Sequence, residues 1–568
     1  FFLEFRDIFS FGGTRTHNSY QRPNVFYSRR IGRSPTGGAP DSADFSFKPD
    51  HTTIAGAVKI TGRTSNGWSV GFLDAVTTAE HISFTSGSAD EIKYNRRAEP
   101  PSNYLVTRVR KDFNNGRSVI GGLFNSVHRS MSSDHLEQDL TARAYTAGVD
   151  FEHGINGRDW IVSGVGAASF VQGSNEAMIS LQESSARYFQ RTGAGYVNVD
   201  SSRTSLNGTF TEFSILHRGD KWEQSVTYSD VSPGFEVNDL GFMRRSDRRG
   251  ISLFKSFYQR TPNGIFHYYN FRISQTLGWN YGGTLVNSGI KANAFFRLRN
   301  FWYFSVNGGT ALLKNYNDRL TRGGPLAESP RSLWQYLSLG SDSRKPFSAG
   351  LSYYGRDDVE GEFDRNLSLV LRFRPASNIS LELRPSYSRQ FDVDQFVDTF
   401  KDPLANHTNG KRYVFADIKQ QRLSSTLRLN WTFSPGLSLQ LYAQPMISSG
   451  IYSNFKEFTD PGGFAFSSFG EDKGTVQKEE ESYQIDPDGK GPAPSFSFDD
   501  PDFNFRSLRG NTVFRWEFQP GSTFYLVWQQ FRDDDLKTGT LDMDRDFNQL
   551  WNSKSNHTLL VKFSYWFS

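Results

Sequence analysis

The chain has 568 residues, a formal net charge of +4, no cysteine and 15% aromatic residues, among them 51 Phe. This charge is too small for the length to indicate nucleic-acid binding, and the absence of cysteine excludes disulfides, thiolate metal sites and cysteine nucleophiles. The mean hydropathy is only −0.56 despite so many aromatic rings, which indicates sheets that are apolar on one face and polar on the other, as in transmembrane β-barrels.

Very short turns rich in Gly, Asn and Pro separate the predicted strands. Gly and Asn supply the positive φ that two-residue hairpin turns require, and Pro fixes φ at the start of a turn. Each such turn predicts an antiparallel hairpin. In chain order the turns cover 64–68, 113–117, 154–158, 218–222, 261–265, 299–301, 341–345, 374–379, 434–437 and 519–523.

Larger and mostly polar connections lie between these tight turns. They cover approximately 34–51, 79–102, 130–140, 172–203, 230–248, 279–285, 315–330, 357–364, 392–419, 452–504 and 534–554. Because tight turns and long connections alternate, an antiparallel meander places all tight turns at one rim and all long loops at the other. Bacterial outer-membrane barrels have this asymmetry, with short periplasmic turns and longer extracellular loops.

The predicted strands alternate between apolar and polar side chains. Leu427, Leu429 and Trp431, for example, alternate with Arg428 and Asn430. Successive side chains of a strand point to opposite faces of the sheet, and an Arg or Lys in the middle of a lipid-facing surface costs about 2–4 kcal/mol. We therefore expect lipid on the apolar faces and the barrel lumen on the charged faces.

The pattern predicts 21 strands from residue 52 to the end of the chain and one more at 24–33. We therefore predict an all-β fold, a transmembrane antiparallel up-and-down β-barrel of about 22 strands (range about 20–24), since bacterial barrels have an even number. The final strand, 558–568, is expected to pair with the first. Residues 24–568 are predicted to form a single barrel domain, with residues 1–23 packed in the lumen or at the rim.

The notable extracellular loops of this barrel are predicted at 172–203, 392–419 and 452–504. Loops as long as the last are usually functional or disordered in a compact domain. We expect the 452–504 loop to cap the pore or to dock a partner.

The densest basic cluster lies at the predicted barrel mouth and comprises Arg244, Arg245, Asp247, Arg248 and Arg249. Guanidinium groups match the geometry of phosphates and carboxylates, so the cluster is a candidate site for lipopolysaccharide phosphates or an anionic substrate. In the alternative interpretation the same arginines form a salt-bridged network that fixes the loop, with Asp239 and Asp247 as partners. The nearby carboxylates favour this alternative.

An acidic run near the C-terminus begins like a calcium-binding loop. Asp542, Asp544 and Asp546 have the required spacing, but Phe547 stands where that loop needs Gly, and Ser553 stands where it needs a bidentate Glu. A solvated acidic loop is the better interpretation, and we predict no metal site.

Residues of the types found in nucleophile triads crowd one predicted loop, namely His128, Ser130, Asp134 and His135. Proximity in sequence is not geometry, so this crowding does not define a triad. We therefore predict no enzymatic activity and no cofactor.

Five stretches resemble a known family: "FFLEFRDIFSFGG" at 1–13, "NVFYSRRIGR" at 24–33, "GFLDAVTTAE" at 71–80, residues 103–129 and residues 234–250. The most specific piece is "NDLGFMRRSDRR" at 238–249. The family these resemble is a bacterial barrel domain of unknown function, which usually follows a signal peptide and a β-sandwich similar to family-9 carbohydrate-binding modules. The resemblance implies a barrel in the outer membrane of a Gram-negative bacterium. The sandwich is absent here, so we expect a processed or truncated product, and its carbohydrate binding does not transfer to these residues.

These observations lead to two hypotheses about function. The first is a pore or partner-gated channel for a medium-sized solute, with glycan-derived solutes as candidates. The alternative is a structural or interaction barrel that anchors a surface or secretion assembly. The expected partners are outer-membrane lipid, lipopolysaccharide and another outer-membrane or surface protein, with no nucleic acid.

Overall fold

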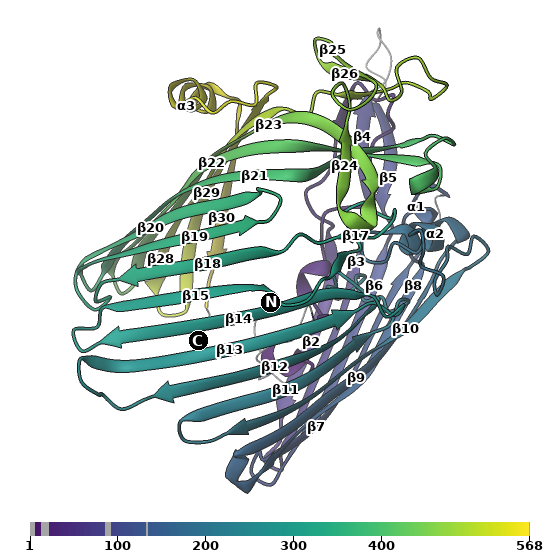
Figure 1. The fold of residues 1–568 in the computed structure, drawn as a ribbon. Helices are drawn as coiled ribbons and strands as arrows, with labels where there is room; N and C mark the ends of the chain where they lie inside the picture. The colour runs from purple at the N-terminus through teal and green to yellow at the C-terminus, as the bar shows by residue number, and fades with distance from the viewer. Residues whose placement is uncertain (1–5, 13–21, 86–92, 132–133, 567–568) are drawn as a thin grey trace. The chain divides into compact units, whose positions relative to one another are not determined.

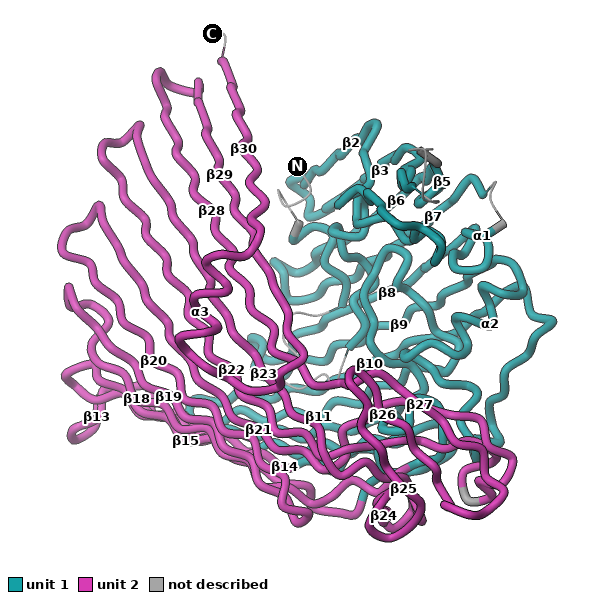
Figure 2. Tube along the Cα trace, turned by 90° about the horizontal axis from the view of Figure 1, so that it is seen from above, with its two compact units in different colours: residues 1–256, 274–289, 315–326 teal, residues 257–273, 290–314, 327–568 magenta. Residues whose placement is uncertain are grey.

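The computed structural model describes residues 6–12, 22–85, 93–131 and 134–566. The chain divides into two compact units (Figure 2). Unit 1 comprises residues 1–256, 274–289 and 315–326, and unit 2 comprises residues 257–273, 290–314 and 327–568. In the described part of the chain, every helix is too short or too polar to cross a membrane.

A large antiparallel sheet of 22 strands dominates the described residues and confirms the predicted all-β fold (Figure 1). In unit 1 each strand pairs with the next in the order β2 (Ile54–Arg63), β3 (Trp68–Thr77), β6 (Ser102–Phe113), β7 (Ser118–Arg129), β8 (Arg143–Ile155), β9 (Trp160–Gln172), β10 (Ser205–Arg218) and β11 (Trp222–Val231). Three further strands contribute residues to both units, β12 (Arg248–Gln259), β13 (Phe266–Trp279) and β14 (Leu285–Leu298).

Unit 2 continues the same antiparallel meander. Its strands pair in the order β15 (Tyr303–Ala311), β18 (Ser332–Gly340), β19 (Phe347–Asp358), β20 (Phe363–Ala376), β21 (Ile379–Lys401), β22 (Lys411–Ser434), β23 (Leu437–Asp460), β28 (Phe503–Gln519), β29 (Ser522–Leu536) and β30 (Ser555–Ser564). Pairing of the last strand with the first, which would join the two units, stays a prediction, as do the predicted domain boundaries.

The remaining elements lie in the long connections. Unit 1 has a small sheet of β1 (Phe45–Phe47), β4 (Glu80–Thr85) and β5 (Lys93–Glu99), the helices α1 (Asp134–Glu137) and α2 (Asn175–Glu183), the 3-10 turns η1 (Arg6–Phe9), η2 (Ser28–Arg30) and η3 (Asn156–Arg158), and the short β16 (Tyr316–Asn317). Unit 2 has β17 (Ala327–Glu328), β24 (Ala465–Ser468), a sheet of β25 (Thr475–Lys478), β26 (Ser482–Asp486) and β27 (Phe496–Asp499), the turns η4 (Asn406–Thr408) and η5 (Pro461–Gly463), and the helix α3 (Met543–Asn552).

The tight turns lie where the sequence predicts them. In the β6–β7 hairpin, Asn114, Asn115 and Gly116 have φ values of 53°, 55° and 78°, which Asn and Gly tolerate best. In the β2–β3 turn, Gly67 has a φ of 89°, and a Cβ there would lie only 2.7 Å from the Asp112 carbonyl oxygen. Only glycine fits at that position.

The prediction of a strand at 24–33 is wrong. The meander from Ile54 onward has the 21 strands that the sequence predicts. The twenty-second strand of the main sheet is β24, which pairs with the end of β23. Residues 24–33 instead make one isolated bridge, Asn24 to Phe242, followed by the turn η2. Val25 and Ile31 are buried in the hydrophobic clusters of unit 1, so tertiary packing overrides the strand pattern of this stretch.

The loop predicted at 392–419 is shorter than expected, because β21 runs on to Lys401 and β22 begins at Lys411. Extra residues interrupt the register of β21 after Asp392 and Phe396. Such bulges break the period of two that marks a strand in the sequence. This extension of the hairpin also packs aromatic rings, with Phe396 and Phe415 edge-to-face at 5.9 Å.

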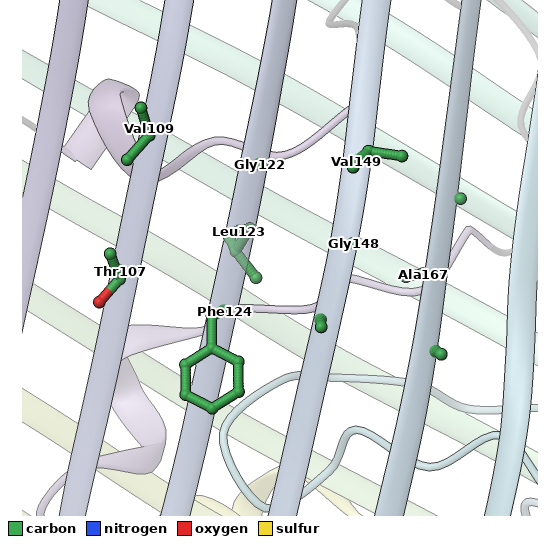
Figure 3. Close-up of a pocket in the computed structure, with 11 residues that line it drawn as sticks. Thr107, Val109, Gly122, Leu123, Phe124, Gly148, Val149 and Ala167 are labelled. Atoms are coloured by element: carbon green, nitrogen blue, oxygen red, sulfur yellow. The ribbon is translucent and has the colours of Figure 1, made fainter.

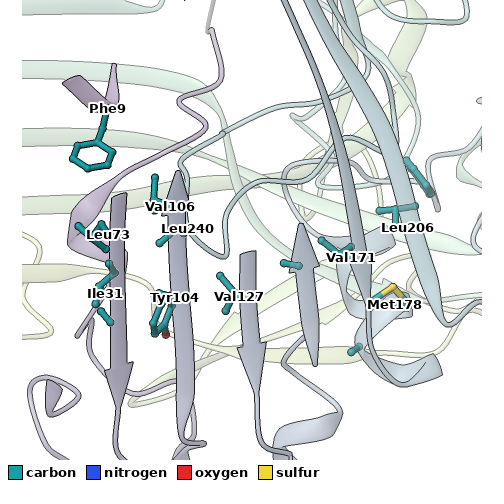
Figure 4. Packing of buried hydrophobic residues seen from close by; sticks show 14 residues of the cluster. Phe9, Ile31, Leu73, Tyr104, Val106, Val127, Val171, Met178, Leu206 and Leu240 are labelled. Carbon is teal, nitrogen blue, oxygen red and sulfur yellow. The ribbon is translucent and has the colours of Figure 1, made fainter. Parts of the chain in front are cut away.

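Unit 1 buries a hydrophobic cluster on one face of its sheet (Figure 4). It combines strand residues with residues of the N-terminal segment and the loops, including Phe9, Ile31, Leu73, Tyr104, Val106, Val127, Val171, Met178, Leu206 and Leu240. The opposite face is exposed, as the alternation predicts: Leu123 of β7 is 4% exposed, whereas the next residue, Phe124, is 40% exposed.

Candidate functional site

The arginine-rich loop between β11 and β12, residues 232–247, packs closely on the strand below it. A Cβ on Gly208 of β10 would come 2.1 Å from the backbone nitrogen of Phe235. Phe235 and Met243 are buried in one cluster with Phe210 of β10. The apolar residues of the loop therefore fix its backbone and hold its charged residues in set positions.

Two buried carboxylates, Asp247 and Asp318, bind the arginines of this region. Asp247 accepts hydrogen bonds from Arg191 Nη2 at 3.0 Å, from the Tyr196 hydroxyl at 2.7 Å and from a backbone nitrogen of the β13–β14 turn at 2.9 Å. Asp318 accepts from Arg191 Nη1 at 3.2 Å and from Arg245 Nη2 at 2.7 Å. Several donors surround each carboxylate, which is the condition under which buried charges are tolerated.

Burial and charge shift the pKa values of groups in this loop network. Burial raises the pKa of the Tyr196 hydroxyl, and the negative charge of Asp247 raises it further. Burial, aided by the positive charge of Arg245, lowers the pKa of Arg319 beside Asp318 to about 10. Arg319 therefore still carries its proton at neutral pH.

The five predicted site residues do not form one binding surface. Arg245 and Asp247 are buried inside the network, and Arg248 is buried at the start of β12. Arg244 and Arg249 are exposed, and their guanidinium carbons lie 5.8 and 4.0 Å from the centres of neighbouring aromatic rings. The geometry supports the structural interpretation for Arg245 and Asp247, while anion binding by Arg244 and Arg249 stays a prediction.

Sequence reasoning missed much of this network. The predicted partner Asp239 instead pairs with Arg129 of β7 at 2.6 Å. Arg191 and Asp318 come from two other loops, and Arg191 is 56 residues from Asp247 along the chain. No local pattern links residues so far apart, so only the fold could bring them together.

The N-terminal segment covers the buried face of unit 1. Besides the apolar contacts of Figure 4, it meets an ion pair in which Arg108 of β6 binds both carboxylate oxygens of Asp150 of β8, at 2.6 and 2.9 Å. The Phe11 ring lies 5.5 Å from the Arg108 guanidinium carbon, and the Gly12 nitrogen donates to Asp150 at 3.3 Å. The chain itself therefore occupies this face.

The polar face of unit 2 carries a ladder of charged and aromatic residues across four strands. The register places Arg372 of β20 beside Glu382 of β21, Glu382 beside Arg428 of β22, and Arg428 beside Tyr442 of β23. Arg372 Nε lies 2.5 Å from Glu382 Oε2, and the Arg428 guanidinium carbon lies 5.4 Å from the Tyr442 ring centre. Arg428 is exposed, so this part of the face is open to a solute.

Cations outnumber carboxylates along the middle of this polar face. Asp364 and Asp392 lie towards the extracellular ends of their strands. The part of the face between these two residues and the periplasmic turns of β20–β23 and β28 has only two carboxylates, Glu382 and Glu517. It has six guanidinium groups, those of Arg372, Arg384, Arg422, Arg428, Arg509 and Arg515. Such an excess of one sign attracts mobile ions of the other sign.

The long connection 452–504 is structured and folds over the polar face of unit 2. Phe469, Tyr483 and Ile485 form a buried cluster with Val414 and Ala416 of β22. In β22 the even-numbered residues share one face, so Val414 and Ala416 lie on the same face as Arg428. The loop packs above the charge ladder at the extracellular end.

A depression of about 600 Å³ lies on the exposed face of β6–β9 (Figure 3). Its lining includes the small residues Gly122, Gly166 and Ala168 and the larger residues Val109, Phe124 and Val149. Its lining is almost entirely apolar. It offers no acid–base or ligand-binding groups and belongs to the apolar surface of the sheet.

The acidic residues whose spacing resembles a calcium-binding loop cap and anchor the helix α3. Asp542 caps α3 by accepting from the Arg545 nitrogen at 2.9 Å, and Asp546 accepts from Asn504 Nδ2 at 3.0 Å and Arg545 Nε at 2.8 Å. Among the described residues, no three His, Asp or Glu side chains are grouped so that they could hold a metal ion.

The triad-type residues have separate partners. His128 packs edge-on against the Tyr145 ring at 5.3 Å, and a ring nitrogen of His135 lies 2.8 Å from the Arg97 carbonyl oxygen. The two histidines are therefore engaged with different neighbours. The prediction that the protein is not an enzyme stays a prediction.

The exposed face of the sheet has the character of a lipid-facing surface. Large apolar side chains stand exposed on successive strands, for example Leu337, Leu351, Leu367 and Leu381 on β18–β21. Tight turns join the strands at one end, and the long structured loops lie at the other. These are the features of a bacterial outer-membrane β-barrel, and the chain is an outer-membrane protein of this class.

Several solved outer-membrane proteins are similar to this chain, with low sequence identity and low TM-scores. The siderophore receptor PirA from Acinetobacter baumannii is 8% identical with a TM-score of 0.35, and the match covers 88% of this chain and 74% of PirA. The alcaligin receptor FauA from Bordetella pertussis is 11% identical with a TM-score of 0.33, covering 84% of this chain and 73% of FauA. An anion-selective porin from Comamonas acidovorans is 10% identical with a TM-score of 0.26, covering 57% of this chain and 89% of the porin.

No curated protein matches the sequence. A family model described as a domain of unknown function, DUF5916, matches residues 2–157 and 172–568. This match spans nearly all of the chain, including the arginine-rich loop and the strands of both units. The protein therefore belongs to the DUF5916 family.

Proposed function

We propose that the protein is an outer-membrane channel for a medium-sized anionic solute, with acidic glycan fragments as the first candidates to test. The observation that carries this proposal is the exposed basic ladder on the polar face of unit 2. In a barrel of about 22 strands the polar face lines a lumen that must be either filled or wet. Fixed cations along such a wall concentrate anions near it.

The proposed channel is gated by the chain's own segments or by a partner. The N-terminal segment packs on the polar face of unit 1 through Phe9 and Phe11. The 452–504 loop packs on the polar face of unit 2 through its cluster with Val414. Both segments would have to yield, or leave a passage, when a solute crosses.

Ion selectivity in planar bilayers tests the proposal. We expect the wild-type protein to conduct with a preference for anions, and Arg428→Gln to lower the anion-to-cation permeability ratio by about twofold, because it removes one of few fixed charges in the lumen. Arg389→Gln is the matched control. Arg389 lies on the opposite face of the neighbouring strand β21, so its loss should leave selectivity unchanged.

A second candidate is a structural barrel that anchors a surface assembly, and the packed β25–β27 sheet of the 452–504 loop is the feature that favours it. This sheet offers a folded platform on the extracellular side. A protein that gives no conductance steps in bilayers, with or without added acidic oligosaccharides, and that co-purifies with one partner would support the scaffold and overturn the channel.

A further inference from the structure

The helix α3 has an exposed apolar stripe along one flank. Met543, Phe547 and Trp551 are spaced by four residues and so lie along one side of the helix. Their side chains are 51%, 40% and 69% exposed. Asp546 and Leu550 lie beside this stripe, their centre about 80° from its centre around the helix axis, and are buried. The helix therefore packs on the sheet through Asp546 and Leu550 and leaves the adjoining apolar stripe exposed along its flank.

A charge network holds α3 against β28 and β29. Arg506 of β28 is fully buried, with its Nη2 2.7 Å from Asp534 of β29 and its Nη1 3.6 Å from Asp546 of α3. Asp546 also accepts from Asn504 of β28 at 3.0 Å. These contacts fix the orientation of the helix, so the exposed stripe is a set feature of the fold.

The helix sits on the apolar, lipid-facing side of the sheet. In β28 the even-numbered residues share a face, so Arg506, which contacts α3, lies on the same face as Phe514 and Trp516. Trp516 is exposed and stands next to the periplasmic turn of β28 and β29. The surface that α3 occupies is thus continuous with the surface that meets lipid.

The height of α3 on this surface matches the outer edge of a membrane. Arg506 and Trp516 are ten residues apart, which at a rise of about 3.4 Å per residue is about 34 Å along the strand. With the strand tilted by about 40° from the membrane normal, this becomes about 25 Å, the height of the apolar band of an outer-membrane barrel. A helix contacting Arg506 therefore lies at the outer interface if Trp516 lies at the inner one.

The side chains beside α3 change from apolar to polar at this level. Trp528 of β29 and Leu559 of β30 are paired in register and exposed. Towards α3 they are followed by His557 and then by Arg532, whose guanidinium carbon lies 5.5 Å from the Trp551 ring centre. An aromatic ring beside a cation at the edge of an apolar band is typical of a membrane interface.

We propose that α3 is an interfacial anchor that inserts Met543, Phe547 and Trp551 among the acyl chains at the outer boundary of the bilayer. Amphipathic helices bind the interface in this way by burying an apolar face about 5–10 Å into the headgroup and acyl boundary. Such an anchor fixes the depth and tilt of the barrel on the side of its last two strands. The proposal does not depend on whether the barrel conducts.

The absence of cysteine from the chain makes single-site labelling a direct test. Phe547→Cys, labelled with an environment-sensitive fluorophore, is reconstituted in liposomes of phosphatidylethanolamine and phosphatidylglycerol containing a lipid brominated near the top of its acyl chain. Asn548→Cys, the exposed polar neighbour on the same helix, is the matched control. We expect the brominated lipid to quench the label at Phe547→Cys at least about threefold more than the label at Asn548→Cys.

Met543→Cys repeats the test at a second position of the stripe, and heat-dependent gel mobility shows that each variant is folded. Aqueous iodide should reach the label at Asn548→Cys and not the labels at the two stripe positions. If iodide reaches the stripe positions and brominated lipid does not quench them, the anchor proposal is overturned. Labels shielded from both quenchers would show that protein covers the stripe, which also overturns it.

Discussion

At the level of single residues, buried charge is tolerated in this protein where several donors surround each carboxylate. Asp318 and Asp247 share Arg191 between them, and each binds a further partner of its own, Arg245 for Asp318 and Tyr196 for Asp247. Removing one member of such a network leaves a buried charge without its partner. The resulting loss of stability is larger than the net stabilisation that the intact network provides.

Asp318→Asn tests this network. The substitution removes the counter-charge of Arg245 and one of the two counter-charges of Arg191, so we expect it to destabilise the 232–247 loop, by about 3–5 kcal/mol if both arginines stay buried. Limited proteolysis of the folded protein in detergent should then cut this loop faster than in the wild type. Arg244→Gln, an exposed change in the same loop, should leave the cleavage rate unchanged, and equal cleavage of both variants would contradict the structural role.

Glu362, in the turn between β19 and β20, is a second residue whose environment has a measurable consequence. Burial raises its pKa to about 9, helped by a hydrogen bond with Asp358 and by the negative charge of Asp394. A raised pKa means that the folded turn favours the protonated carboxyl. The stabilisation of the folded turn by the protonated Glu362 carboxyl is complete below the ordinary pKa of 4.5. It is lost as the pH rises through about 9.

The turn should therefore loosen as the pH rises from 6 towards the pKa of about 9. Hydrogen exchange of the amides at 357–364, corrected for the intrinsic effect of pH, measures this opening. Glu362→Gln cannot ionise, so its turn should show no such pH dependence. Glu360→Gln, an exposed neighbour, should behave like the wild type, and a wild-type turn whose corrected exchange is flat with pH would contradict the assignment.

At the level of elements, alternation predicts strands well wherever the lipid-facing and polar sides differ in character. The same rule fails at 24–33, where side chains that alternate as in a strand are used instead to fill the interior of unit 1. It also fails beyond Asp392, where bulges break the period of two. The first failure lies outside the meander, and the second lies in the bulged extension of β21.

The N-terminal segment is the element whose removal from the polar face should be easiest to detect. Burying a Phe side chain stabilises by about 1.5–3 kcal/mol, and a carboxylate in its place would be driven into water. We expect Phe9→Asp to release the segment and to raise the mean conductance in planar bilayers. Phe45→Asp is the control, because Phe45 on the small β1–β4–β5 sheet is already exposed. An unchanged conductance in Phe9→Asp would show that the segment does not narrow the passage.

At the level of the whole molecule, the two compact units treat their polar faces differently. Unit 1 covers its polar face with the N-terminal segment and the loops at 172–203 and 232–247, and unit 2 keeps a basic strip exposed below the 452–504 loop. A scaffold would gain nothing from keeping arginines such as Arg428 unburied in the middle of a strand. This difference is the main physical reason for preferring a channel.

The sequence by itself determined the class of the fold, the 21 strands of the meander, their tight turns, and which face of each strand is apolar and which is polar. These features depend on neighbouring residues, through the period of two and through the φ values that Asn, Gly and Pro favour. Only the tertiary structure decided which charges are buried, what fills the polar face of unit 1 and which way α3 turns its apolar stripe. Those features depend on contacts such as Arg191 with Asp318 or Arg506 with Asp546, whose partners are far apart in the chain and leave no local pattern.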